Sequence, residues 1–187
     1  MPPRAMQRLG NLPQVAGSNI PSNRKGNILT AKFMAEVARK RAGHPAIQRL
    51  ARDILLQYKV PSQHYASEAL AIGDFVKKNV RYVRDPNGIE QLTDPVLMIE
   101  ELGRMASQGD CDDMALLIAT LLLSVGHQPY FRMVRYGRDS GPFDHIYVVV
   151  HERNPGAAGT RLVLDAIMKD KAIGYEVPHT SGEEVAV

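Results

Sequence analysis

The chain has 187 residues, of which 44% are hydrophobic and 23% charged, and it contains a single cysteine. This length suits one domain with a substantial core and an appendage. One cysteine excludes an internal disulfide and a multi-cysteine zinc or iron–sulfur site, and no apolar run reaches the roughly 18 residues of a transmembrane helix. We therefore expect no metal, no cofactor and no membrane span, and synthesis in a reducing cytoplasm.

The net charge of +3 hides an uneven distribution. Residues 1–60 hold 11 Lys or Arg and 2 Asp or Glu, which gives +9, whereas residues 61–187 hold 12 and 18, which gives −6. A solvated set of helix faces explains this asymmetry, and so does docking of the N-terminal part on an acidic partner. Because no aromatic interleaving or nucleic-acid motif accompanies the basic residues, we expect residues 1–60 to grip a protein and not a nucleic acid.

The first 60 residues divide into two predicted segments. Residues 1–26 are rich in Pro, Gly, Asn and Ser without periodicity, and we interpret them as an extended N-terminal arm. Residues 27–60 form a basic helical segment with two amphipathic helices, the first capped by Asn27 and the second opened by Pro45. These helices are interpreted either as a lid on the core or as a separate docking module.

Residues 61–178 are predicted to form the core, and its first half is helical. Ser62 to about Tyr82 has the apolar period of a helix, and Asp85 to Gly88 has the composition of a turn. Asp94-Pro95 begins a further helix that ends near Gly103. A loop then leads to the most apolar segment, Cys111 to Val125, which predicts a helix buried nearly all round.

After that helix the apolar period changes from about 3.6 residues to about 2. Strands are predicted over 130–136, 145–150 and 161–166, and residues 179–187 are interpreted as a C-terminal tail. Helices first and strands afterwards predict an α+β fold, in which N-terminal helices precede an antiparallel sheet packed on a buried central helix.

The only cysteine begins the buried helix, within the stretch Gly109-Asp110-Cys111-Asp112-Asp113. The unpaired N–H groups and positive dipole at a helix N-terminus favour a thiolate and can hold an oxyanion, and Gly109 would let a substrate backbone approach. The alternative is that Cys111 is simply a small buried hydrophobe. The neighbouring carboxylates raise the pKa of a thiol, so a catalytic cysteine here needs a base to activate it.

Among the six histidines, His145 and His151 bracket one predicted strand. If strands 145–151 and 161–166 form a hairpin, position 151 lies near 161 and position 147 near 165, so Asp165 lies at the His145 end. Asp144 and Asp170 are the alternatives to Asp165. The other histidines adjoin loops or helix ends and are predicted to lie on the surface: His44, His64, His127 and His179.

Together these residues predict a nucleophile, a base and a residue that orients the base. His145 accepts the proton of Cys111, Asp165 fixes the imidazole tautomer, and the thiolate attacks an amide or ester carbonyl to form a thioester. Water or an amine then resolves the acyl-enzyme. The N–H group of Cys111 is one expected oxyanion donor, and Gln108 is the candidate for a second.

These motifs resemble the transglutaminase-like superfamily, in which the same order carries a Cys-His-Asp triad. The resemblance lies in Gly109 to Asp113, the Leu/Ala-rich helix, His145 at the start of a strand and Leu164-Asp165 on the next. Val80 to Asp85, followed by the Asp94-Pro95 helix, resembles the phage and prophage branch of transglutaminase-like cysteine peptidases. The resemblance covers about residues 62–175 and implies a papain/transglutaminase-like core.

Two departures from the family pattern bear on the reaction. Asp110 stands where many transglutaminases have Gln, and the Leu164 run lacks the Trp common near that Asp. The resemblance therefore implies hydrolysis of a peptide, isopeptide or amide bond in a protein or peptide substrate, by a component of a phage virion or tail. The alternatives are a structural or adaptor virion protein that keeps the fold with an idle site, and a transamidase.

Overall fold

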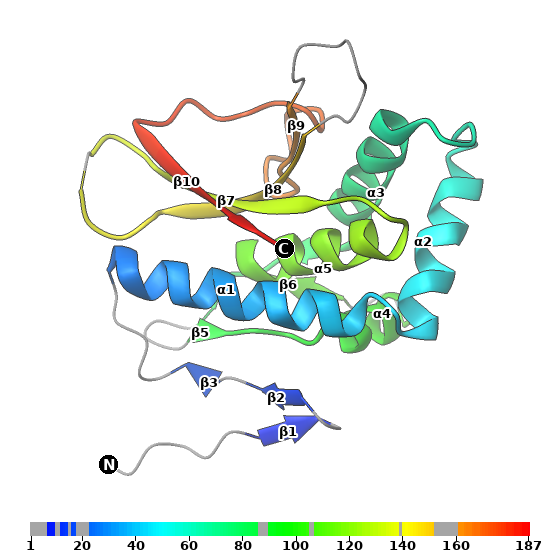
Figure 1. The fold of residues 1–187 in the computed structure, drawn as a ribbon, viewed down its shortest axis with the longest axis horizontal. Helices are drawn as coiled ribbons and strands as arrows, with labels where there is room; N and C mark the ends of the chain where they lie inside the picture. Colours follow the sequence, from blue (N-terminus) through cyan, green and yellow to red (C-terminus); the bar gives the residue numbers. More distant parts are fainter. Residues whose placement is uncertain are drawn as a thin grey trace.

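The computed structural model describes residues 7–9, 12–14, 16–17, 23–85, 90–104, 107–138, 140–151 and 161–187. Helices come first in the chain, and a four-stranded antiparallel sheet contains its later strands (Figure 1). This confirms the predicted α+β fold. Within the described ranges, no helix has the length and apolar character needed to cross a bilayer. Much of the predicted arm, residues 86–88 of the predicted turn and residues 105–106 of the predicted loop lie outside the described residues.

The described helices follow the predicted order, and the side chain of the residue before each one accepts a backbone N–H group. They are α1 (Arg24–Arg41), α2 (Pro45–Gln57), α3 (Tyr65–Asn79), α4 (Pro95–Leu102) and α5 (Cys111–Ser124). The predicted start of α1 is wrong: its cap is Asn23, whose Oδ1 accepts from Gly26 N at 3.1 Å. Asn23 and Asn27 are equally good caps by residue type, so local preference alone does not choose between them.

The sheet has the strand order β10-β7-β8-β9. Its strands are β7 (Pro129–Arg135), β8 (His145–His151), β9 (Arg161–Leu164) and β10 (Ser181–Ala186). The predicted hairpin register is confirmed, since His151 lies opposite Arg161 and Val148 opposite Leu164. The prediction of a tail over 179–187 is wrong, because β10 pairs along the whole edge of β7. The segment Ser181-Gly-Glu-Glu has few β-forming residues, so backbone pairing makes this strand.

Short pairs of strands complete the description. β1 (Gln7–Leu9) pairs with β2 (Leu12–Gln14) inside the predicted arm, and β3 (Ala16–Gly17) pairs with β5 (Glu90–Gln91). β4 (Arg81–Tyr82) runs parallel to β6 (Gln108–Gly109). This last pair matters for the site, because β6 ends two residues before Cys111 and so fixes the approach of the chain to α5.

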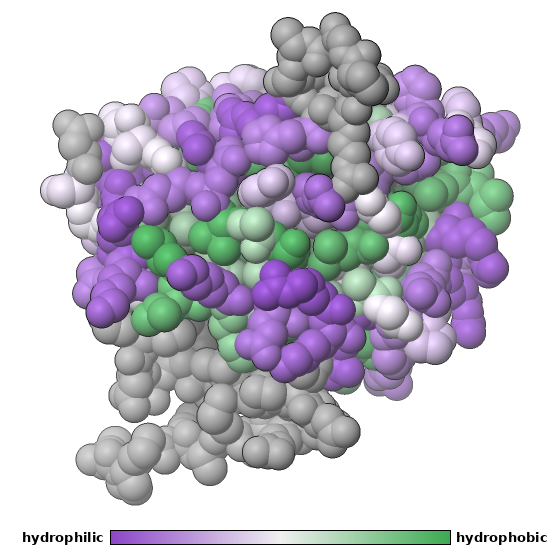
Figure 2. All heavy atoms as spheres, in the orientation of Figure 1, coloured by the Kyte–Doolittle hydropathy of each residue, from purple (hydrophilic) through white to green (hydrophobic). Residues whose placement is uncertain are grey.

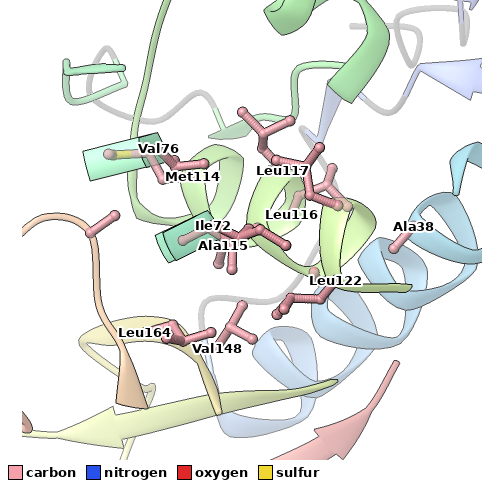
Figure 3. Packing of buried hydrophobic residues seen from close by; sticks show 14 of the residues in the cluster. Ala38, Ile72, Val76, Met114, Ala115, Leu116, Leu117, Leu122, Val148 and Leu164 are labelled. Carbon is pink, nitrogen blue, oxygen red and sulfur yellow. The ribbon is translucent and has the colours of Figure 1, made fainter. Parts of the chain in front are cut away.

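Helix α5 is the centre of the core, as its all-round apolar sequence predicts. Its buried leucines pack between the sheet and the other helices. Figure 3 shows Val148 and Leu164 of the sheet on one side of α5, with Ile72 of α3 and Ala38 of α1 on others. A helix enclosed in this way has little freedom to shift, so the position of its first residue is set by the core.

Helices α1 and α2 are part of this core. Met34 of α1 and Ile47 and Ile54 of α2 are at most 1% exposed and belong to the same hydrophobic cluster as α5. Basic residues such as Lys25 and Lys32 are exposed. On the face seen in Figure 2, an apolar band crosses between two hydrophilic regions, in the area that β10 and α1 occupy in Figure 1.

The packing of α1 gives a testable prediction. Met34→Ala should lower the free energy of unfolding by about 2–5 kcal/mol, because it leaves a cavity against α5 in a fully buried position. Leu29→Ala, at a position on the same helix that is 50% exposed, should change it by less than about 1 kcal/mol. Urea denaturation followed by circular dichroism measures both, and a single transition unaltered by Met34→Ala would mean that α1 does not share the core.

Candidate active site

Cys111 is the first residue of α5, and a network of carboxylates fixes it there. Asp110 caps the helix: its Oδ1 accepts from Asp112 N at 2.9 Å and from Asp113 N at 3.2 Å. In return, Asp113 Oδ2 accepts from Asp110 N at 3.3 Å, which completes a capping box. The acidic residues around the cysteine are therefore required in part by the helix itself.

Gly109 packs against the third of these acidic residues. A Cβ atom at position 109 would lie 2.6 Å from Asp113 Cβ, so only glycine fits. The close approach predicted for a substrate at Gly109 is thus occupied by Asp113, which is 3% exposed and also accepts from Thr93 N at 2.6 Å. Burial is the main reason that the pKa of Asp113 rises to about 7.

His145 and Asp165 form a buried pair at the edge of the sheet. His145 Nε2 lies 2.8 Å from Asp165 Oδ2, and the two residues are 5% and 4% exposed. Asp165 Oδ1 accepts from Ile167 N at 3.2 Å, which holds the carboxylate in place. Of the alternatives weighed above, Asp144 pairs with Arg138 and Asp170 is exposed.

Cys111 and His145 line the same cavity, which has a volume of about 150 Å³. Asp110 and Asp112 line it beside the cysteine, and Asp144 lines it beside His145. The predicted nucleophile and the predicted base therefore line one cavity, and Asp165 Oδ2 lies 2.8 Å from Nε2 of that base.

Gln108 is not among the residues that line this cavity. Its side chain is exposed, and its Oε1 accepts from Arg81 Nη2 at 2.7 Å. The oxyanion role of Gln108 stays a prediction, and the described geometry directs its side chain to Arg81.

The electrostatic environment favours the neutral thiol. Cys111 is half-buried, and its Sγ donates to Asp112 Oδ1 at 3.4 Å. Burial, followed by the charges of Asp112 and Asp110, raises the pKa of the Cys111 thiol well above its ordinary value. Donation from the backbone N–H of Ile146 to the sulfur acts in the opposite direction. The resting site therefore holds a thiol, and ionisation requires a proton acceptor at the moment of attack.

Tyrosines border the site, and the sequence analysis did not single them out. Tyr136 stacks on the His145 ring with centroids 6.4 Å apart, and Tyr147 lies 5.4 Å from the same ring. Burial and then the charge of Cys111 raise the pKa of Tyr82. Tyrosine is common in and beside strands, so its presence in these segments gave no separate signal of a site.

The remaining histidines have other roles. Nδ1 of His44 and of His64 accepts a backbone N–H at the start of α2 and α3. The surface position predicted for His127 is wrong: it is 6% exposed, and its Nε2 lies 3.1 Å from Glu68 Oε2. The turn after α5 directs this side chain inward toward α3. His151 pairs with Glu184 at 3.0 Å.

The same cluster that caps α5 offers ligand atoms to a cation. Within the described part of the chain, Asp110, Cys111 and Asp112 form the one group of three or more such residues whose ligand atoms lie close together, within 4.8 Å of one another. Two carboxylates and a thiol are fewer than the roughly six to eight oxygen ligands that Ca²⁺ takes, and Asp110 already serves the helix cap.

Comparison of the sequence with protein-family models and with curated proteins gave no match. Among solved structures, the fold is similar to a candidate cysteine protease from Cytophaga hutchinsonii, with a TM-score of 0.44 and 17% identity over 75% of this chain and 51% of that one. For a candidate protease from Parabacteroides distasonis the TM-score is 0.45, with 15% identity over 72% of this chain and 30% of that one. LapG from Legionella pneumophila gives a TM-score of 0.43, with 18% identity over 66% of this chain and 72% of that one.

The chain thus spans 51% and 30% of the length of the first two proteins. None of these likenesses bears on a phage origin. The proposals below rest on the residues of this chain.

Asp113 gives a prediction for the pH dependence of stability. A folded pKa of about 7, above the unfolded value, means that the folded state keeps a proton which the unfolded state has lost between about pH 4 and pH 7. The contribution of Asp113 to stability therefore falls as pH rises through this window. Asp113→Asn should remove a decline on the order of a few kcal/mol from the pH profile of the free energy of unfolding. Asp53→Asn, at an exposed position, is the control and should leave the profile unchanged.

A second prediction concerns the thiol. Asp112→Asn removes the carboxylate bonded to Sγ, so the pKa of Cys111 should fall and more thiolate should be present at pH 8. Because a less basic thiolate is also less nucleophilic, alkylation by iodoacetamide should rise by about threefold for each pKa unit lowered. Mass spectrometry of the labelled protein measures this rate, and a slower reaction in Asp112→Asn would contradict the assigned effect of the charge.

Proposed function

We propose that the protein is a thiol hydrolase that cleaves a peptide, isopeptide or amide bond, with Cys111 as nucleophile, His145 as base and Asp165 as the residue that orients the base. One observation carries the proposal. A buried imidazole bonded to a buried carboxylate borders the cavity that the only cysteine lines. A perturbed thiol beside such a pair is the arrangement that nucleophilic catalysis requires.

In the proposed mechanism, each proton transfer has a named atom. Asp165 occupies Nε2 of His145, so Nδ1 is the ring nitrogen that takes the thiol proton. The resulting thiolate attacks the carbonyl carbon of the substrate, and the imidazolium returns the proton to the leaving amine. A thioester then links the acyl group to Cys111 until water, deprotonated by His145, releases the acid.

The high pKa of the thiol fits this sequence of steps. A thiol that stays neutral at rest is protected from alkylation and oxidation, because the thiolate is the reactive form. The imidazolium that forms beside Asp165 offsets the negative charge of Asp110 and Asp112 only during the reaction. Charge separation is thus confined to the time when a substrate carbonyl is present.

The raised pKa of the Cys111 thiol also favours a second candidate function. If His145 does not take up the proton, a thiol with a raised pKa is inert, and the chain then serves as a structural or adaptor protein with an idle site. Transamidation remains a further alternative, in which an amine replaces water at the thioester.

The biological setting is also part of the proposal. The substrate is a protein or peptide, and the exposed basic residues of α1 and α2, together with the segment before them, bind a protein partner. We place the protein in the cytoplasm at synthesis and then in a phage virion or tail. That placement is supported by the resemblance of Val80 to Asp85 and the helix after it to phage transglutaminase-like peptidases.

Hydrolysis of fluorescein-labelled casein tests the enzyme proposal. Cys111→Ala should reduce hydrolysis to background, and His145→Ala should reduce it by about 100-fold or more, since it removes the base. His151→Ala removes a histidine that pairs with a carboxylate at the other end of β8, and it should retain activity.

Circular dichroism should show the same fold for each variant. Hydrolysis that persists in Cys111→Ala would rule out the thiol mechanism, and a purified wild type without activity would favour the adaptor. Incorporation of a fluorescent cadaverine into casein would instead reveal the transamidase.

A further inference from the structure

One wall of the active-site cavity comes from α1, a helix predicted either as a lid on the core or as part of a separate docking module. Asn27, Thr30 and Ala31 line the cavity together with Cys111 and His145. Their spacing of three and four residues puts them on one face of the helix. Because α1 also packs on α5, this wall is held in a fixed position relative to the thiol.

A hydrogen bond fixes how the Asn27 amide is turned. The backbone N–H of Phe143 donates to Asn27 Oδ1 at 2.9 Å, which identifies the carbonyl end of the side chain. The Nδ2 end then lies on the opposite side of the amide. Because Oδ1 serves Phe143, Nδ2 is the end of this cavity-lining side chain that is left to donate.

Phe143, the partner of Asn27, is itself held firmly. The guanidinium of Arg135 lies 4.1 Å from the centre of the Phe143 ring, and Arg135 is 5% exposed. Arg135 Nε also donates to Gly141 O at 3.0 Å. The segment before His145 is therefore anchored, and it holds the Asn27 amide at the wall of the cavity, which Phe143 also lines.

The other polar side chains of the cavity are mostly acceptors. Asp110, Asp112 and Asp144 are carboxylates, which repel a developing negative charge. His145 is required for proton transfer. This leaves Asn27 Nδ2 and the Thr30 hydroxyl as the neutral side-chain donors in the lining.

We propose that Asn27 is an oxyanion-binding residue, whose Nδ2 donates to the substrate carbonyl oxygen as it becomes negative. The inference rests on the proposed function and deepens it, because it assigns to Asn27 the role that the sequence suggested for Gln108. A neutral amide donor is suited to this task in an acidic cavity, since it stabilises the oxyanion without neutralising Asp110 or Asp112.

A purely structural role for Asn27 makes a different prediction. If Asn27 only anchors Phe143, an acceptor at its Oδ1 position suffices. Asn27→Asp keeps that acceptor and loses the donor, whereas Asn27→Ala loses both. Asn27→Asp also adds a negative charge to the cavity lining, so Thr30→Asp is the matched control, because it adds the same charge to the same lining and leaves the Asn27 amide in place.

Two reactions of the same thiol separate the oxyanion effect from a change in pKa. In acylation by p-nitrophenyl acetate, the sulfur–carbon bond forms through a tetrahedral oxyanion and p-nitrophenolate leaves. In alkylation by iodoacetamide, the sulfur displaces iodide and no oxyanion forms. The ratio of the two rate constants at one pH therefore cancels any change in the fraction of thiolate.

Asn27→Asp and Asn27→Ala should both lower this ratio by on the order of 100-fold, whereas Thr30→Asp, which adds only the charge, should lower it by about tenfold or less. A ratio unchanged in Asn27→Asp, or lowered in Asn27→Ala alone, would overturn the inference while leaving Cys111 as the nucleophile. A wild type that releases p-nitrophenolate no faster than Cys111→Ala would instead end the proposed function, and the inference with it.

Discussion

Burial of α5 on every side is the constraint on which the site depends. The sheet, α1, α2 and α3 all pack against this helix, so its axis and its first turn are fixed by the core. The thiol is therefore placed by the packing of leucines several turns away. The β4–β6 pair and the capping box then complete the positioning, because they determine how the chain enters the helix at Cys111.

The second half of the site comes from the sheet. His145 begins β8, and Asp165 directly follows β9, so the register of that hairpin brings the two side chains together. The same pairing could be inferred from the sequence once the two strands are taken as a hairpin. With residue 151 opposite residue 161, strand parity puts Asp165 at the His145 end of the hairpin. A slip of one residue would turn Asp165 to the opposite face and break the bond to His145. The sheet thus sets the base and its partner as firmly as the core sets the thiol.

What the sequence did not predict follows from contacts between distant segments. The apolar period predicted α2, α3 and the central strands, and the all-round apolar sequence predicted α5, because these patterns depend only on neighbouring residues. The Asp94-Pro95 start signal predicted α4. By contrast, β10 has few β-forming side chains and exists because β7 offers an unpaired edge. The contribution of α1 to the cavity wall was not predicted for a similar reason. By residue type Asn27 is a helix cap, and only the packing of α1 against the core brings it to Phe143.

The acidic stretch around Cys111 is weaker evidence for catalysis than it first suggests. Asp110 and Asp113 cap α5, and Gly109 is required by contact with Asp113, so a helix with no chemical role would need the same residues. His145 and Asp165 cap no helix, although Asp165 Oδ1 accepts from Ile167 N in the turn after β9. Burying a histidine with a carboxylate costs desolvation energy that apolar side chains of similar size would avoid. Such a pair is not by itself evidence of chemistry, since His127 and Glu68 form another buried one. What favours proton transfer here is that His145 lines a cavity together with Cys111.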